Sequence, residues 1–185
     1  MIRVFDAENM ETELIQIGAA PVQGCISCNA CAKRGKCVFD DVVNELAQKF
    51  KDVDGLVVGS PVYYASPNGS VISLLDRLMY STSYSKQLKV GAAIVSARRS
   101  GASAALDVLN KYFANRNMVL AGSTNWNIVH GFTPEDVKKD LEGLQTVRNL
   151  AGNMAFLIRA ISDAKEKYTL PAEELSAFTS FPDGK

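Results

Sequence analysis

All four cysteines of this 185-residue chain lie within one short segment, residues 24–37, which reads GCISCNACAKRGKC. The spacing is C-x2-C-x2-C-x5-C, formed by Cys25, Cys28, Cys31 and Cys37. Cysteine thiolates are soft ligands for zinc and for iron–sulfur clusters, and they are the nucleophiles of thiol–disulfide exchange. Grouping every thiol of the chain in one segment therefore points to a metal centre or to redox chemistry.

The spacing favours an iron–sulfur cluster. Three cysteines at two-residue gaps can wrap one corner of a cubane, as in the cysteine runs of bacterial ferredoxins, and a fourth can close the site. Structural zinc is the second interpretation, although zinc sites usually use two separated pairs of ligands. Reduced structural cysteines, or a thiol pair that exchanges disulfides, form the third. Lys33, Arg34 and Lys36 would lower the cysteine pKa values and offset the negative charge of a ligated cluster.

Two further segments carry residues that suit a planar ligand. Residues 60–69, SPVYYASPNG, contain the adjacent Tyr63 and Tyr64, which offer flat faces with polar tips. Residues 96–101, SARRSG, place two arginines before a glycine, and guanidinium groups stack on rings or bind phosphate. The plainer interpretations are an ordinary turn with tyrosines covering the core, and solvated surface arginines.

The sequence gives little evidence for acid–base catalysis or for a nucleotide-binding motif. His130, with Trp126 nearby, is the single histidine and lacks a carboxylate or serine partner, so we expect a structural or ring-contacting role. The sequence has no Walker motif and no G-x-G-x-x-G, which excludes nucleotide binding through those motifs.

Short apolar runs alternate with amphipathic stretches, which is typical of an α/β fold with a parallel sheet. We predict strands at residues 12–17, 55–59, 88–96 and 118–123, and helices at residues 40–50, 68–82, 101–116 and 134–164. In the last helix we expect Thr133 as the N-cap, Pro134 in the first turn and Asp136 completing a capping box. We find no repeat or linker, so residues 1–185 are interpreted as one domain.

The order of the elements predicts where the unusual segments meet. The cysteine segment and residues 60–69 and 96–101 each follow a predicted strand. In parallel sheets, ligands bind beyond the carboxyl ends of the strands. We therefore expect all three segments at one edge of the sheet, and the redox interpretation depends on this shared edge.

Composition narrows the partners and the location. Lys and Arg together number 20, as do Asp and Glu, so the formal net charge is zero, which argues against a broad surface for nucleic acid or an anionic membrane. We find no apolar run of membrane-spanning length and no signal-peptide layout at the N-terminus. We expect a cytoplasmic protein with reduced thiols, no nucleic-acid partner and no membrane partner.

Taken together, the motifs resemble the flavodoxin-like NADPH-dependent FMN reductases, in particular their iron–sulfur flavoprotein branch. The similarity rests on GCISCNACAKRGKCVFDD, GLVVGSPVYYASPNG, LLDRL, VSARRSG and DLEGLQTVRNLAGNMAFL. It implies a flavodoxin-like parallel sheet with helices on both faces, FMN at the sheet edge and a [4Fe–4S] cluster. It also implies a homodimer or homotetramer, because in this family the flavin lies near a subunit interface.

The resemblance implies roles for individual residues. The metal ligands would be Cys25, Cys28, Cys31 and Cys37. The residues lining the isoalloxazine ring would be Pro61, Val62, Tyr63, Tyr64, Ser66, Asn68 and Gly69. The residues touching its other edge would be Ser96, Ala97, Arg98, Arg99 and Gly101. Arg77 matches an Asp-Arg pair of the family and is a candidate for an interface contact.

The chain departs from the family pattern at its start. Family members begin with a strand and a Gly-Ser-Pro-rich loop that holds the FMN phosphate, whereas residues 1–10 look like the tail of the family's first helix. The first strand is central in a flavodoxin-like sheet of order 2-1-3-4-5. We therefore expect a sheet that lacks its usual first strand and phosphate loop, with a gap between strands 12–17 and 55–59.

These inferences predict a cytoplasmic electron-transfer flavoprotein similar to NAD(P)H-dependent FMN reductases. FMN would exchange a hydride or single electrons, with NAD(P)H as a candidate donor, and the cluster would relay electrons to a small redox partner or a small-molecule acceptor. The alternative is a non-enzymatic domain whose four cysteines hold structural zinc and which has no functional flavin site. A flavin-free remnant that only oligomerises is the third interpretation.

Overall fold

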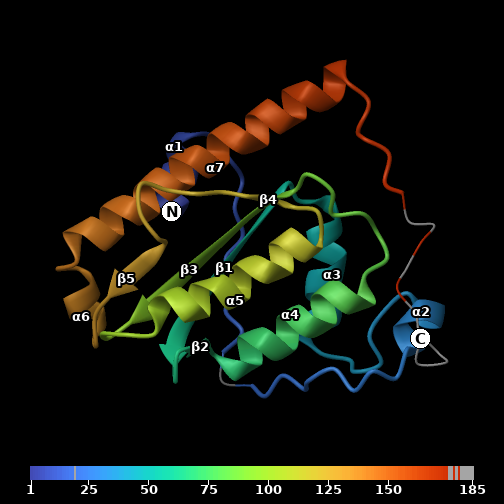
Figure 1. Ribbon diagram of the computed structural model, residues 1–185, viewed down its shortest axis with the longest axis horizontal. Coiled ribbons are helices and arrows are strands. Elements are labelled where there is room, and N and C mark those ends of the chain that lie inside the picture. Colours follow the sequence, from blue (N-terminus) through green and yellow to red (C-terminus); the bar gives the residue numbers. More distant parts are fainter. Residues whose placement is uncertain (19, 175–176, 178, 180–185) are drawn as a thin grey trace.

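The computed structural model describes residues 1–18, 20–174, 177 and 179, and a mostly parallel sheet forms its centre (Figure 1). The two long strands, β1 (Gly55–Tyr63) and β3 (Val90–Ala97), run parallel and adjacent to each other. Both are nearly continuous apolar runs, as strands covered on both faces should be. Their carboxyl ends therefore lie at the same edge of the sheet.

In the part of the chain that the structure describes, three short strands complete the sheet. β4 (Val119–Leu120) and β5 (Ile128–His130) pair in parallel with the beginning and the end of β3. β2 (Ser66–Pro67) folds back antiparallel on the end of β1. The fold class predicted from the sequence, a parallel α/β sheet, is confirmed.

Helices cover both faces of the sheet because alternate residues of β3 point to opposite sides. Ala93 and Val95 join a larger core, which also contains residues of α3 (Val42–Asp52), α4 (Gly69–Ser81) and α5 (Ala102–Asn115). Val90 and Ala92 join a smaller core, which contains residues of α1 (Ile2–Ala7) and α7 (Leu141–Lys167). No helix in the described part of the chain combines the length and the apolar character of a membrane span.

The predicted strand at residues 12–17 is wrong. Residues 11–17 have no regular structure, and Ile17 packs against the larger core from outside the sheet. Among the described residues, positions 55–61 of β1 pair with β3 alone. A strand needs a neighbour for its backbone N–H and C=O groups, and no such neighbour lies between residues 12–17 and β1.

The predicted long C-terminal helix is two helices. α6 (Pro134–Val137) begins with the predicted capping box of Thr133 and Asp136, which is confirmed. α7 then starts afresh at Asp140, whose carboxylate accepts a hydrogen bond from the Gly143 N–H at 2.9 Å. A side chain that caps the backbone in this way favours a new helix start over continuation.

Candidate functional site

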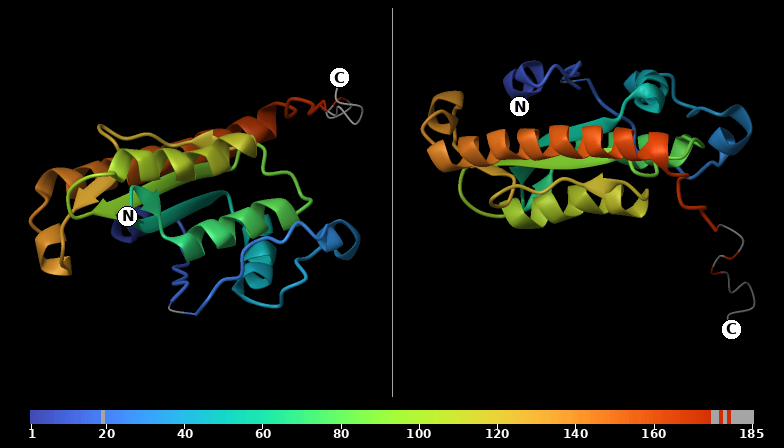
Figure 2. Two further views of the ribbon diagram at one scale, coloured as in Figure 1. Left: turned by 60° about the horizontal axis from the view of Figure 1, so that its bottom comes forward. Right: turned by 90° about the horizontal axis from the view of Figure 1, so that it is seen from above.

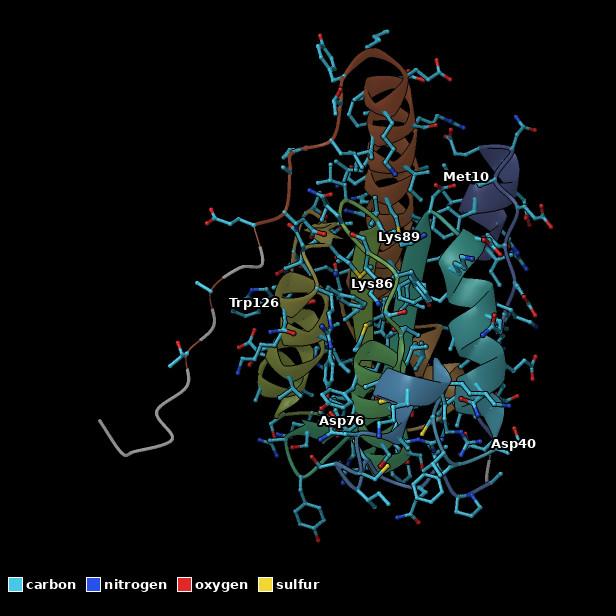
Figure 3. The ribbon with its side chains drawn as sticks, turned by 90° about the vertical axis from the view of Figure 1, so that its right-hand side faces the viewer. Met10, Asp40, Asp76, Lys86, Lys89 and Trp126 are labelled. Carbon is cyan, nitrogen blue, oxygen red and sulfur yellow. The ribbon has the colours of Figure 1, made fainter. Side chains whose placement is uncertain are left out.

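The four cysteines line one pocket beside the short helix α2 (Ala30–Arg34). All four are free thiols; Cys25 and Cys28 are exposed, and Cys31 and Cys37 are partly buried. Figure 3 shows sulfur atoms gathered near the end of the molecule where Asp40 and Asp76 are labelled. The other residues that line the pocket are Ile26, Asn29, Val38, Phe39, Arg77, Tyr80 and Ser81.

This set of donors suits a sulfur-ligated group. None of the described residues lining the pocket is a carboxylate or a histidine, so its anionic ligands are thiolates, which select zinc or iron–sulfur clusters over magnesium or calcium. In the described part of the chain, no three Cys, His, Asp or Glu side chains meet at a point where one metal ion could sit. A single tetrahedral ion would therefore require the thiols to move closer together, whereas in a cubane each iron takes one cysteine.

Hydrogen bonds hold both the backbone and the sulfur atom of Cys37 in place. Its N–H donates to Asn44 Oδ1 at 2.9 Å, and Asn44 Nδ2 donates to the carbonyls of Cys37 and Phe39 at 3.2 and 2.9 Å. Arg77 Nε donates to Cys37 Sγ at 3.2 Å. The first turn of α3 and the middle of α4 thus hold this thiol in place.

Arg77 is the buried charge of the site, with only 1% of its surface exposed. Its two terminal nitrogens donate to both carboxylate oxygens of Asp41, at 2.6 and 2.8 Å, and to the carbonyls of Gln23 and Phe39, at 3.1 and 3.2 Å. With the bond to Cys37, all five guanidinium N–H groups have acceptors. The hydrogen bond from Arg77 holds the pKa of Asp41 below its ordinary value. Arg77 therefore links both ends of the cysteine segment, and the expectation that it contacts a partner subunit is wrong.

The loops after β1 and β3 lie together, as predicted. The β1–β2 hairpin turns at Tyr64 and Ala65, which have φ angles of 51° and 59°. A Cβ atom placed on Gly101, whose φ is 83°, would come within 2.8 Å of Ala65 Cα. The residues of the β3–α5 loop thus pack directly against the hairpin.

Several predicted ring-contacting residues stabilise this hairpin. The buried Ser60 accepts a hydrogen bond from the Asn68 N–H at 2.8 Å, and Asn68 caps α4 by accepting from the Ser70 N–H at 2.9 Å. Pro61 and Val62 end β1, Ser66 forms β2, and Gly69 opens α4. Tyr63 is 57% exposed and Tyr64 is fully exposed, so their rings present free flat surfaces.

Arginine and aromatic side chains also lie at this edge of the sheet. Ser96 and Ala97 end β3, and the exposed Arg98 and Arg99 follow. The Arg98 guanidinium lies 5.5 Å from the centre of the exposed Phe132 ring, in cation–π geometry. The edge can therefore offer flat surfaces and positive charge to a planar anionic ligand.

His130 lies at the same edge, because it is paired with Ala97 of β3. Its backbone N–H donates to the Asp140 carboxylate at 2.6 Å, and its ring is exposed. Its ring Nδ1 lies 3.7 Å from the same Asp140 carboxylate, so the expectation that His130 lacks a carboxylate partner is wrong.

The cysteine segment does not share this edge, so the prediction of one common edge is wrong. Its pocket is lined by Arg77, Tyr80 and Ser81 of α4, whereas the hairpin leads into the first residue of that helix, Gly69. At 1.5 Å per residue, the two positions lie about 12 to 18 Å apart along the helix axis. Figure 2 shows α2 at the end of the molecule opposite α6.

The reason for this separation is that the cysteine segment does not follow a strand of the sheet. Residues 11–17 lie outside the sheet. The chain then runs along α4, where Gly24 lies beside Ser73. The redox interpretation therefore loses the support of a shared edge within one chain, and it depends instead on the cysteine pocket and on kinship.

Sequence reasoning missed the residues that hold Cys37 and Arg77 in place. Asn44 and Asp41 lie in an ordinary amphipathic helix start, and nothing in their spacing relates them to Cys37. Arg77 did leave a signal, because it interrupts the apolar run LLDRLM, where a buried charge requires a buried partner.

Comparison with known proteins identifies the family. Residues 2–133 match the family described as NADPH-dependent FMN reductase. The chain is 32% identical over 162 residues to an iron–sulfur flavoprotein of Methanocaldococcus jannaschii, covering 83% of this chain and 84% of the relative. The chain belongs to the NADPH-dependent FMN reductase family.

Within that family, this member falls in the iron–sulfur flavoprotein branch. A second relative, an iron–sulfur flavoprotein of Methanosarcina thermophila, is 26% identical over 170 residues, covering 90% of this chain and 88% of the relative. The resemblance inferred from the motifs is thus confirmed. Kinship makes this family member a flavin oxidoreductase-like electron-transfer protein.

Solved structures confirm the flavodoxin-like fold of this family member. RosB with a bound 8-demethyl-8-formylriboflavin-5'-phosphate intermediate aligns with a TM-score of 0.65 at 15% identity, covering 98% of this chain and 82% of that one. A flavodoxin from the domain Archaea aligns with a TM-score of 0.52 at 16% identity, covering 85% and 84%. At this identity the likeness concerns the fold alone.

Proposed function

We propose that this family member is a cytoplasmic electron-transfer flavoprotein with two redox groups. FMN binds at the carboxyl edge of β1 and β3, and a [4Fe–4S] cluster binds to Cys25, Cys28, Cys31 and Cys37. The observation that carries the proposal is that all four cysteines, as free thiols, line one pocket. The names of the relatives support it, since both are iron–sulfur flavoproteins.

When bound, FMN supplies hydride and single-electron chemistry, and the cluster supplies single-electron chemistry. The chain supplies position and charge. Ser60 and Asn68 hold the hairpin so that Tyr63 and Tyr64 present their rings at the sheet edge. Arg98 and Arg99 bring positive charge to the same edge, where it would favour an anionic reduced ring.

Three further features belong to the proposal. NAD(P)H is the electron donor, a small redox partner or small molecule is the acceptor, and the protein assembles as a homodimer or homotetramer. The wide separation of the two sites along α4 supports assembly, because a second subunit can bring its own cysteine pocket to the hairpin edge.

The test is anaerobic purification followed by spectroscopy and metal analysis. We expect flavin absorption bands, a broad iron–sulfur absorbance, and about four iron and four sulfide per chain for a cubane cluster. The variant Cys28→Ala should lose iron while keeping flavin. One zinc per chain with no iron would support the structural-zinc alternative instead and overturn the cluster.

The donor is tested by mixing the purified protein anaerobically with NADPH or NADH. Bleaching of the flavin bands supports NAD(P)H as the donor. Absence of bleaching by either nucleotide, with full bleaching by dithionite, would exclude NAD(P)H and leave the two-cofactor proposal intact.

A further inference from the structure

Arg77 contacts one of the four cysteine sulfurs directly. Its Nε–H donates to Cys37 Sγ at 3.2 Å, and its side chain is almost completely buried. The charged residues within the cysteine segment itself, Lys33, Arg34 and Lys36, are exposed to solvent. Because water screens exposed charges, the guanidinium of Arg77 is the cation of this site whose field reaches the thiol with least screening.

The geometry of this contact is fixed from several sides. Arg77 is held by Asp41 in a bidentate pair and by the carbonyls of Gln23 and Phe39. Its guanidinium carbon also lies 5.0 Å from the centre of the Phe39 ring. The Nε–H therefore has one available direction, toward Cys37, and cannot turn away when the charge on the sulfur changes.

We propose that Arg77 is a positioning residue that raises the reduction potential of the cluster through Cys37, and that Asp41 offsets part of this effect. The inference rests on the proposed [4Fe–4S] cluster. Reduction adds one electron to the cluster from an external donor, and no bond forms or breaks. Hydrogen bonds and positive charge at the ligand sulfurs stabilise the more negative, reduced form.

The two partners of the ion pair act on the potential with opposite signs. Removing the guanidinium removes a donor and a positive charge beside Cys37, which disfavours the reduced form. Removing the charge of Asp41 leaves the guanidinium in contact with Cys37 and no longer compensated, which favours the reduced form. Both changes break the same ion pair, so purely structural damage would move the potential in one direction for both variants.

The experiment is a dithionite redox titration of the anaerobically purified protein, followed by the electron paramagnetic resonance signal of the reduced cluster. The variants are Arg77→Gln, Arg77→Lys and Asp41→Asn. Arg34→Gln is the matched control, because it removes one exposed positive charge from the cysteine segment. Iron content and thermal unfolding are measured for every variant.

We expect the lowest potential in Arg77→Gln, an intermediate value in Arg77→Lys, and a value above that of the unmodified protein in Asp41→Asn. Arg34→Gln should move the potential less than Arg77→Gln does. If the Arg77 variants lose their iron, the inference is tested by Asp41→Asn alone, whose reduction potential should be higher than that of the unmodified protein.

Unchanged potentials in iron-loaded variants, or shifts of the same sign for Arg77→Gln and Asp41→Asn, would overturn the inference alone. Absence of iron from the unmodified protein would overturn the inference together with the proposed cluster.

Discussion

At the scale of single residues, the site depends on backbone conformations that few residues adopt. Tyr64 and Ala65 both have positive φ, the combination that a two-residue hairpin turn of the favoured type requires. This conformation raises the conformational free energy of a non-glycine residue. It persists here because neighbouring contacts hold the two residues in place. Gly101 provides one of those contacts, since its missing side chain lets the β3–α5 loop approach the hairpin.

We predict that Gly101→Ala lowers the free energy of unfolding by about 1–3 kcal/mol, because a Cβ atom would collide with Ala65 and strain a positive φ. Urea denaturation measures the change. Gly122→Ala is the control, because a Cβ atom at Gly122 meets nothing within 4 Å. Equal effects of the two substitutions would contradict the proposed contact.

Lys86 gives a prediction about pH. It is buried, donates to the carbonyls of Thr82 and Tyr84 at 3.2 and 3.0 Å, and has its pKa lowered from 10.5 to about 8, first by burial and then by the positive charges of Arg116 and Lys89. Between pH 8 and 10 the folded state has released this proton while the unfolded state still binds it. The Lys86 contribution to stability therefore rises with pH across this window.

The measurement compares the unmodified protein with Lys86→Met by urea denaturation at pH 7.5 and pH 9.5. The difference in unfolding free energy should shift in favour of the unmodified protein at the higher pH. Staying below pH 10 avoids the opposing contribution of Tyr84, whose pKa is raised by burial to about 12. A difference that does not change with pH would contradict the shifted pKa of Lys86.

At the scale of elements, the helices pack on the sheet at glycines. A Cβ atom at Gly91 of β3 would come within 2.6 Å of the Phe113 ring of α5, and one at Gly55 of β1 within 2.5 Å of Met154 Cε of α7. These two positions set how closely α5 and α7 approach the parallel strands. The helix α7 also contains Gly152, where a Cβ atom would meet nothing within 4 Å.

We predict opposite effects of the same substitution at these positions. Gly152→Ala should stabilise the protein by about 0.5–1 kcal/mol, because alanine loses less backbone entropy in a helix. Gly91→Ala should destabilise it by about 1–3 kcal/mol through overpacking against Phe113. Thermal and urea denaturation measure both changes, and a destabilising Gly152→Ala would contradict the open space beside Gly152.

The elements show what a sequence can predict and what it cannot. Helices α3, α4 and α5 follow from their apolar spacing, and β1 and β3 from their apolar runs between turn residues. The segment predicted as a strand at residues 12–17, TELIQI, mixes polar and apolar residues, and it stays outside the sheet because pairing depends on a neighbour that local pattern does not reveal. For the same reason the sequence identified the four cysteines but not Asn44, which bonds to Cys37, or Asp41, which pairs with Arg77, because both contacts form only after α3 folds.

At the scale of the whole molecule, the two proposed redox sites lie apart along α4. Large apolar side chains are exposed near the hairpin edge, where Tyr64 is fully exposed and Phe132 is 78% exposed. A contiguous exposed apolar patch often marks a protein–protein interaction site. This exposure agrees with the proposed homo-oligomer.

We predict that light scattering after size-exclusion chromatography gives two or four times the mass of one chain. Phe132→Asp should shift the distribution toward the monomer, because a carboxylate would be buried at the contact. Tyr168→Asp, at a similarly exposed position after α7, is the control and should leave the mass unchanged. A monomeric mass for the unmodified protein would refute the proposed assembly.

The guanidinium of Arg77 joins the carbonyl of residue 23 to that of residue 39, so the stretch between them is closed at its base. Bringing the two ends of a flexible chain together costs entropy, and here the folding of α3 and α4 has already met that cost. The loop is therefore already tethered before any group binds the thiols. The entropic cost of ordering the polypeptide on binding is small as a result.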